Sequence, residues 1–402
     1  MQAKAMKAMK AAQTAQAAQT AQTAQTTKRT ILSVIGTRPE AIKMAPVIHE
    51  LQRRPEAFTS VVCSTGQHRE MLDQALELFA ITPDEDLRLM THNQSLAQLT
   101  ARLFTALDET LARVRPDAVL AQGDTTTVLV ASIAAFYRGI PFGHVEAGLR
   151  TGDKRRPFPE EINRRLADAV TDLAFAPTER SRQALLREGF TPDDIYVTGN
   201  TVIDALLDIA ARPYTWRGSP LAELPEDGRF VLITAHRRES FGDAFRQLCL
   251  AIRELADEFA PQGLHFVYPV HLNPNVRQPV GEILGGARNV TLLEPLDYVS
   301  LVQVMKRSKL ILTDSGGIQE EAPSLGVPAL VMRETTERPE GIDAGVVKLV
   351  GTSRERIVSE ARRLLSDPAA HARMATRANP YGDGQAAARI VDALQERLGA
   401  LG

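Results

Sequence analysis

The chain is poor in cysteine and has no metal-ligand spacing. Its two cysteines, Cys63 and Cys249, each lie in an apolar segment, and no CxxC pair occurs. A disulfide framework or a zinc site is therefore not expected. The dinucleotide pattern GxGxxG and the phosphate-binding pattern GxxxxGK[ST] are also missing. We predict a protein that uses no metal and no cofactor.

Long apolar runs are missing as well. No stretch approaches the roughly 18–20 apolar residues that span a bilayer. Residues 1–29 form a low-complexity segment of Ala, Gln and Thr without the apolar core of a secretory signal. We interpret them as a disordered leader on a cytoplasmic protein that has no membrane partner.

Acids outnumber basic residues outside this leader. The formal net charge is −2, and residues 1–30 hold five basic residues and no acid, which leaves −7 for the remainder. An acidic body argues against broad nucleic-acid binding. Any anionic ligand must therefore be held by a local basic cluster.

What the chain does have is a repeated alternation of short β-branched runs, loops and helical patterns. This alternation is typical of parallel sheets covered by helices on both faces. It is interrupted at residues 212–229, which are rich in Pro, Gly and charge, and then restarts. We predict an α/β fold with two Rossmann-like, doubly wound domains and a cleft between them. The expected domains are residues 30–205 and 206–380, and a final helix in 381–402 packs back on the first domain.

Three acids follow apolar runs within thirty-seven residues: Asp124, Glu146 and Glu160. Ligands bind at the carboxyl edge of open α/β sheets, and gathered carboxylates repel one another, so proton-transfer chemistry is the better reason to place them there. Each acid also has a structural alternative. Asp124 could cap a helix, Glu146 could pair with an arginine, and Glu160 could stabilise a helix start with Arg164 one turn later.

Basic residues occur at the corresponding loops. Arg38 and Lys43 belong to a helix start that could bind an anion, although a solvated helix start with surface ion pairs would look the same. His236 and Arg237 follow a strand of the second half and could position a diphosphate, whereas a lone loop histidine is more often structural. His271 is in a similar position.

The turn Ser315, Gly316 and Gly317 lies between a strand and a helix that contains Glu320 and Glu321. Two glycines allow a close approach of backbone to phosphate, and a carboxylate can bind the hydroxyls of a ribose. The turn therefore indicates a nucleotide site. A plain left-handed turn with an aspartate cap is the alternative.

Taken together, these segments resemble the non-hydrolysing bacterial UDP-N-acetylglucosamine 2-epimerases. The resemblance runs from about Thr30 to the C-terminus and rests on the motifs GTRPEAIKMAPVI, TGQHREMLDQ, QGDTTT, HVEAGLRTGD, PFPEEINR, VTGNTVIDAL, AHRRESFG, YPVHLNPNVR, LTDSGGIQEEAPSLG and TTERPEGIDAG. It implies the GT-B type of fold, in which two Rossmann-like domains hold the active site between them.

The resemblance also implies residue roles, matched motif by motif. The expected catalytic residues are Asp124, Glu146, Glu160 and His236. The positions expected around UDP or the sugar are Arg38, Lys43, His68, Arg164, Arg237, His271, Ser315, Gly316, Gly317, Glu321 and Arg338. One departure is Leu301, where relatives often carry an aromatic residue near the uracil.

The implied activity is the reversible epimerisation of UDP-GlcNAc and UDP-ManNAc at C2, which supplies precursors of surface polysaccharides. Elimination of UDP to a 2-acetamidoglucal and its re-addition needs no oxidant, in keeping with the missing nicotinamide fingerprint. Alternatives are a hydrolysing epimerase, a GT-B glycosyltransferase and a non-catalytic UDP-sugar sensor. The resemblance further implies a homodimer and a possible second UDP-GlcNAc as activator, near the segments that contain Gln67 and His271.

Overall fold

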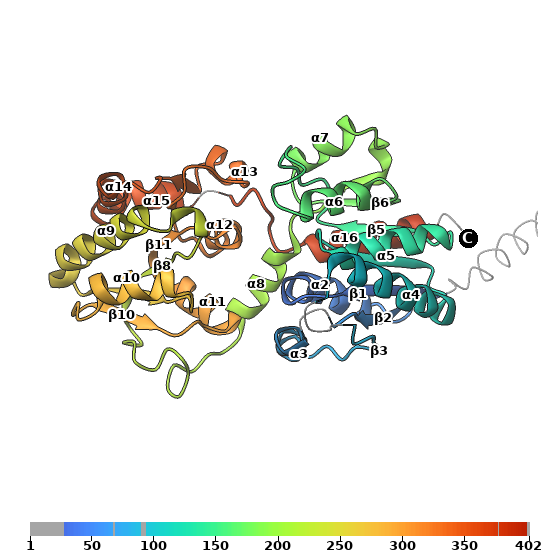
Figure 1. Ribbon diagram of the computed structural model, residues 1–402, viewed down its shortest axis with the longest axis horizontal. Helices are drawn as coiled ribbons and strands as arrows, with labels where there is room; N and C mark the ends of the chain where they lie inside the picture. The colour runs from blue at the N-terminus through green and yellow to red at the C-terminus, as the bar shows by residue number, and fades with distance from the viewer. Residues whose placement is uncertain (1–27, 67–68, 90–93, 377, 400–402) are drawn as a thin grey trace, which may run out of the picture.

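The computed structural model describes residues 28–66, 69–89, 94–376 and 378–399. Nearly all of the predicted leader lies outside these residues. Two parallel sheets, each flanked by helices, form the two halves of the molecule (Figure 1). The predicted fold class is therefore confirmed.

The first sheet has seven parallel strands in the described part of the chain, in the order β3-β2-β1-β4-β5-β6-β7. The strands are β1 (Arg29–Ile35), β2 (Phe58–Ser64), β3 (Glu85–Asp86), β4 (Ala118–Gln122), β5 (Phe142–Val145), β6 (Leu173–Ala176) and β7 (Ile195–Val197). The helices are α2 (Arg38–Gln52), α3 (Arg69–Leu78), α4 (Leu96–Val114), α5 (Thr126–Tyr137), α6 (Glu160–Asp168) and α7 (Glu179–Arg187), with a 3-10 turn η1 (Pro192–Asp194).

The second sheet has six parallel strands among the described residues, in the order β10-β9-β8-β11-β12-β13. The strands are β8 (Arg229–Thr234), β9 (Leu264–Pro269), β10 (Val290–Leu293), β11 (Ser308–Thr313), β12 (Ala329–Val331) and β13 (Val347–Leu349). Its α-helices are α9 (Asp243–Phe259), α10 (Pro274–Leu284), α11 (Tyr298–Arg307), α12 (Gly316–Glu321), α13 (Pro339–Asp343), α14 (Arg354–Ser366) and α15 (Pro368–Ala375). The 3-10 turns are η2 (Arg238–Ser240), η3 (Ala260–Gln262) and η4 (Ala322–Leu325).

Alternate residues of the central strands face opposite layers, which is why these strands read as continuous apolar runs. In β1, Ile31 packs into the core that includes α2, whereas Leu32 packs into the core beneath α4 and α5. In β8, Phe230 and Val231 likewise pack into two different cores, and the core of Val231 includes residues of α9. Both sheets are therefore buried on both faces by helices.

Two helices connect the halves. Helix α8 (Thr201–Ala211) lies between the two sheets in Figure 1 and contacts α2 on one side and α11 and α12 on the other. The last helix, α16 (Ala386–Gly399), returns to contact α2 and α8, and Arg29 donates a hydrogen bond to the carbonyl of Leu398 at 3.0 Å. These crossings bring the carboxyl edges of both sheets toward one junction.

The segment 212–229 contributes to the second half. Trp216 is buried and stacks on Phe230 with ring centroids 5.7 Å apart, while the guanidinium of Arg307 lies 4.8 Å from the Trp216 ring centroid. Of the two readings that its composition allowed, a linker or the edge of a second domain, these contacts favour the edge. No helix in the described residues is long and apolar enough to cross a membrane.

Candidate active site

Two adjoining cavities lie at the junction of the halves. The smaller, of about 240 Å³, follows the ends of β1, β4 and β5 and is lined by Thr37, Pro39, Glu40, Lys43, Gln122, Gly123, Asp124, Thr125, Glu146, Leu149, Arg164 and Arg338. The larger, of about 500 Å³, includes residues from β8, β9 and α12 and extends to Arg38, His236, His271, Ser315, Gly317, Glu321 and Leu301. Pro39, Lys43 and Arg338 line both cavities and so form their common wall.

Glu146 is the most constrained acid of the smaller cavity. It directly follows β5 with a φ of 69°, a left-handed conformation that is unusual for a residue other than glycine and is often found at functional sites. Its buried carboxylate accepts hydrogen bonds from Lys43 Nζ at 2.6 Å and from the Gln122 amide. Burial alone would raise the pKa of Glu146, but the charges of Lys43 and Arg338 outweigh it and lower that pKa. Glu146 is thus held ionised, and its direct ion pair is with a lysine rather than with the arginine of the structural alternative.

Asp124 lies on the same cavity, one residue past Gly123 at the end of β4. Its carboxylate pairs with Arg164 at 2.5 Å, and its backbone carbonyl accepts a hydrogen bond from the Asn163 amide at 2.9 Å. The cap of α5 is Thr125, whose hydroxyl accepts the Val128 N–H. The capping alternative for Asp124 is therefore wrong.

Glu160 is placed differently. It is the first residue of α6, is partly exposed and is not among the residues that line either cavity. Arg164 pairs with Asp124 and Glu161 rather than with Glu160, and the buried Glu161 accepts the Thr151 N–H at 3.1 Å. The structure therefore brings two of the three predicted acids together, and the role of Glu160 stays a prediction.

The start of α2 is occupied by the protein's own carboxylate. Glu40 accepts the N–H groups of Gly36 at 2.5 Å and Thr37 at 2.9 Å, so these donors do not face a ligand as the sequence suggested. Burial raises the pKa of Glu40 to about 7, against the lowering effect of the Thr125 hydroxyl and these N–H groups. Arg38 begins the helix, is exposed and lines the larger cavity.

His236 follows β8 on the wall of the larger cavity. The fully buried Asp314 accepts the N–H groups of His236 at 2.6 Å and Arg237 at 2.7 Å, which fixes this loop to the end of β11. The His236 ring stacks on His271 with centroids 5.2 Å apart. Burial, with smaller contributions from His271 and Arg237, outweighs Asp314 and lowers the pKa of His236, so the ring is neutral at pH 7.

The Ser315 turn is a helix start. Ser315 is extended, α12 begins at Gly316, and neither Gly316 nor Gly317 has a positive φ. The left-handed-turn alternative is therefore wrong, and Asp314 holds the His236 loop instead of capping α12. Gly317 is exposed on the larger cavity, where its backbone is open to a ligand.

Glu321 lies in the apolar part of that cavity. It is buried and accepts a hydrogen bond from the Tyr298 hydroxyl at 2.8 Å. Burial is the main reason that its pKa is raised to about 7. Leu301, the departure from the family pattern, lines the same cavity, as does Leu296.

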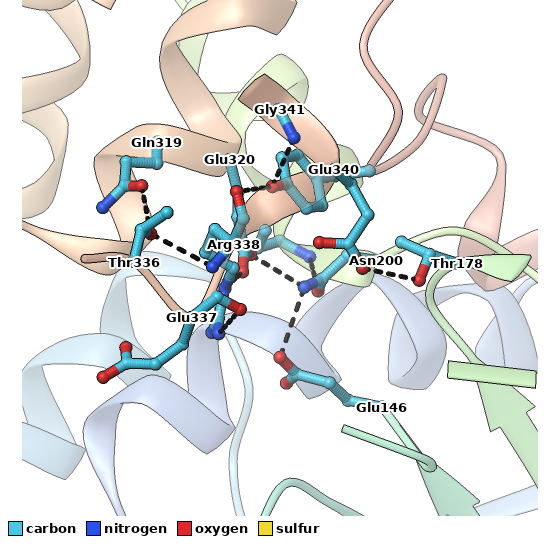
Figure 2. Close-up of polar contacts among 12 residues, drawn as sticks. Glu146, Thr178, Asn200, Gln319, Glu320, Thr336, Glu337, Arg338, Glu340 and Gly341 are labelled. Carbon is cyan, nitrogen blue, oxygen red and sulfur yellow. Dashed lines mark hydrogen bonds and ion pairs between the residues drawn. The ribbon is translucent and has the colours of Figure 1, made fainter. Parts of the chain in front are cut away.

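The common wall is built from paired charges. Glu320, at the end of α12, is buried and binds the Arg338 guanidinium (Figure 2). Burial alone would lower the pKa of Lys43, but Glu146 and Glu320 outweigh it and raise that pKa. Both cations of the wall therefore stay charged at neutral pH.

A buried histidine supports the Asp124 turn. His144 of β5 is fully buried, with Nδ1 2.5 Å from the Asp168 carboxylate and Nε2 2.7 Å from the carbonyl of Gly123. Both neighbours are acceptors, so both ring nitrogens must carry protons. Burial alone would lower the pKa of His144, but Asp168 and the Gly123 carbonyl outweigh it and raise that pKa. His144 is thus a buried imidazolium.

Sequence reasoning did not find every residue of this arrangement. It missed Gln122, His144 and Asn200. The partners of these residues lie 21 to 120 residues away in the sequence, and nothing in the local sequence indicates such contacts. The position of Gln122 as the last residue of a strand was the one usable signal. His68, which was predicted to contact substrate, lies outside the described residues.

Comparison with known proteins gives a consistent result. A family described as UDP-N-acetylglucosamine 2-epimerase matches residues 49–395. The chain is 55% identical to the UDP-N-acetylglucosamine 2-epimerase of Salmonella typhimurium over 91% of this chain and 98% of that one. A putative UDP-N-acetylglucosamine 2-epimerase from Listeria monocytogenes is similar in structure, with a TM-score of 0.87 and 47% identity over 93% and 97% of the two chains. The Neisseria meningitidis UDP-GlcNAc 2-epimerase, solved bound to UDP-GlcNAc, gives a TM-score of 0.80 and 48% identity over 91% and 100%.

The buried His144–Asp168 pair predicts a pH-dependent contribution to stability. Because the pKa of His144 is raised, its stabilising effect is complete below its ordinary value of about 6.5 and is lost as pH rises through the raised value. His144→Gln should lower the free energy of unfolding by about 3–5 kcal/mol below pH 6.5, since it leaves a buried carboxylate short of a partner. Urea unfolding between pH 5.5 and 9 should show this difference shrinking as pH rises.

His371→Gln is the matched control, because His371 is only partly buried and its ring faces one acceptor, the Lys309 carbonyl at 2.7 Å. It should change stability by less than about 1 kcal/mol. A His144→Gln effect that stays constant or grows with pH would contradict the imidazolium assignment.

Proposed function

The chain belongs to the UDP-N-acetylglucosamine 2-epimerase family, and on that premise we propose that it interconverts UDP-GlcNAc and UDP-ManNAc without hydrolysis. In this proposal UDP is eliminated from C1 to leave a 2-acetamidoglucal and is then added back. The relative from Neisseria meningitidis, which was solved bound to UDP-GlcNAc, supports this choice of substrate.

The observation that carries the proposal is the common wall of the two cavities. Lys43 and Arg338 border both a cavity lined by Asp124 and Glu146 and a larger one lined by His236, Ser315 and Glu321. A UDP-sugar has its diphosphate between the sugar and the nucleoside. The proposed pose therefore puts the sugar in the smaller cavity, the nucleoside in the larger one and the diphosphate at the cationic wall.

The chemistry follows from this pose. The C2–H bond of a 2-acetamido sugar is not activated by a carbonyl, so an elimination needs a base at C2 and stabilisation of the departing diphosphate. A carboxylate accepts the C2 proton, the C–H electron pair forms the C1–C2 double bond, and the C1–O pair leaves with UDP. Re-addition of UDP at C1, with proton delivery to the other face of C2, completes the inversion.

The residues divide between these two tasks. Asp124, Glu146 and Glu160 are the proposed proton-transfer groups, each of which would contribute about 10²–10⁴-fold. Glu146 is held ionised, which suits a proton acceptor, and Arg164 orients Asp124. On the phosphate side we assign Arg38, Lys43, Arg237 and Arg338, with His236 as a neutral donor whose pKa would rise beside a diphosphate.

Assembly and regulation are further parts of the proposal. The family resemblance supports a homodimer. Phe136 and Tyr137 at the end of α5 are 60% and 75% exposed, and a partner subunit would cover these large apolar side chains. The same resemblance supports a second UDP-GlcNAc as activator, near His271.

The elimination route predicts isotope exchange. When the reaction runs in D₂O, both UDP-ManNAc and recovered UDP-GlcNAc should gain deuterium at C2, and proton NMR measures it. Phosphorus NMR of the same sample should show no accumulation of free UDP. Product without deuterium would contradict the elimination, whereas steady accumulation of UDP would identify a hydrolysing epimerase.

Removal of the carboxylate charges should lower turnover by orders of magnitude without unfolding the protein. Asp124→Asn and Glu146→Gln keep the volume of each side chain and should lower kcat at least about 10²-fold in a coupled assay for UDP-ManNAc. Glu160→Gln tests whether an acid outside both cavity linings takes part. A near-normal rate removes that residue from the mechanism.

The matched control is Glu85→Gln. Glu85 has a comparable ion pair with Arg113, at 2.6 Å, but belongs to β3 and lines neither cavity. The Glu85→Gln variant should have an unchanged kcat, because Glu85 lines neither cavity and a partly exposed ion pair contributes little to stability. A wild-type protein that binds UDP-GlcNAc but forms no UDP-ManNAc, with binding retained by all variants, would favour the sensor function.

The quaternary state is tested separately. Sedimentation equilibrium should give twice the chain mass of 43.9 kDa, and Tyr137→Lys should shift the distribution toward the monomer. Initial rates should be sigmoidal in UDP-GlcNAc if a second molecule activates. A monomeric wild-type protein would contradict the homodimer. Hyperbolic kinetics would contradict activation by a second UDP-GlcNAc.

A further inference from the structure

Asn200 is buried where the chain first passes between the two sheets. It is the N-cap of α8, and its Oδ1 accepts the Val202 N–H at 3.1 Å. Its backbone N–H donates to the carbonyl of Tyr381 at 2.7 Å, on the segment that returns from the second half. Gly199, with a φ of 90°, lies so close to this segment that an added Cβ would be 3.3 Å from the Gly382 Cα. Asn200 therefore joins both crossings of the chain.

The amide nitrogen of Asn200 faces two carboxylates that belong to different halves. It donates to Glu320 Oε2 at 2.9 Å and to Glu146 Oε1 at 3.3 Å (Figure 2). The orientation of the amide is fixed, because a flip would place its oxygen between two carboxylates and face its nitrogen to a backbone N–H. One side chain thus holds an acid of the smaller cavity and an acid of α12.

Each carboxylate is held from its other side by a cation of the common wall. Glu146 binds Lys43 at 2.6 Å through Oε2, and Glu320 binds Arg338. The charged groups that act on Glu146 are Lys43 from α2, Arg338 from the segment before α13 and Arg164 from α6. Asn200 is the neutral member of a continuous series of hydrogen bonds and ion pairs between side chains. This series extends from Lys43 in the first half to Arg338 in the second.

We propose that Asn200 is a positioning residue that makes the orientation of Glu146 depend on the relative position of the two halves. This inference rests on the proposed function. A shift of α12 moves Glu320 and so acts on the Asn200 amide, which also donates to Glu146. A carboxylate that loses a donor becomes easier to protonate. With the UDP-binding half in the position seen here, the Asn200 amide adds a donor to a carboxylate that Lys43 and Arg338 already hold ionised.

The test separates this bridge from the helix cap. Asn200→Ser keeps an oxygen that caps α8 but cannot reach either carboxylate. It should lower kcat about 10–100-fold, leave the KM for UDP-GlcNAc within about 3-fold, and move the acid limb of the kcat–pH profile up by about one unit. Asn200→Asp retains the volume and the cap but adds a negative charge between two carboxylates, so it should move the limb further.

Thr178→Val is the matched control. The Thr178 hydroxyl also caps a helix, α7, and also crosses between the halves, to Glu340 at 3.1 Å (Figure 2). It touches neither Glu146 nor Glu320, so its loss should reduce thermal stability and leave the pH profile of kcat in place.

The outcomes are distinct. A wild-type pH profile in Asn200→Ser overturns the positioning role, as does an equal shift in Thr178→Val, which would indicate general loosening. Failure of both Asn200 variants to fold also overturns it, because Asn200 would then be a structural requirement. If the wild-type protein forms no UDP-ManNAc, the proposed function is wrong. If the wild-type protein forms UDP-ManNAc and Asn200→Ser has the same kcat and pH profile, only the role of Asn200 is wrong.

Discussion

The buried ion pair between Lys43 and Glu146 is the interaction on which the site depends. Two charges removed from water are unfavourable unless further hydrogen bonds satisfy them. Here Gln122 and Asn200 supply those bonds to Glu146, and Glu320 with Arg338 extends the alternation of charge across the junction. Removal of any one charged member would leave a buried charge unpaired. Residues from six separate segments converge at this point.

The backbone is arranged to make that convergence possible. Glu146 has a left-handed conformation at the end of β5, and the His144 imidazolium ties β5 to the Gly123 carbonyl beside Asp124. Asp314 performs the equivalent task in the second half by accepting two N–H groups of the His236 loop. In both sheets a buried charge holds a strand-end turn, so the functional side chains are presented by rigid elements rather than by free loops.

The distribution of charge fits a two-part ligand. Asp124 and Glu146 lie in one cavity, the other adds apolar side chains such as Leu296 and Leu301 to His236 and Glu321, and the cations Lys43 and Arg338 line both. In the proposed pose an acidic protein binds a doubly charged diphosphate, because the local field at the wall differs in sign from the net charge. The family assignment and this distribution point to the same substrate class.

Sequence alone determined the α/β class and the presence of two sheets, because strands buried on both faces and helices with one apolar face leave periodic signals. It also pointed to Arg38, Lys43, Asp124, Glu146 and His236, since each follows a strand of the repeat. It could not decide which acids meet. Glu160 and its neighbour Glu161 share the same local pattern, yet Glu161 is buried against the 149–152 loop and Glu160 lines neither cavity. Tertiary structure alone brought Asn200 to Glu146, 54 residues away, and to Glu320, 120 residues away. A hydrogen bond depends on a few tenths of an ångström in three dimensions, and no local propensity encodes such a distance.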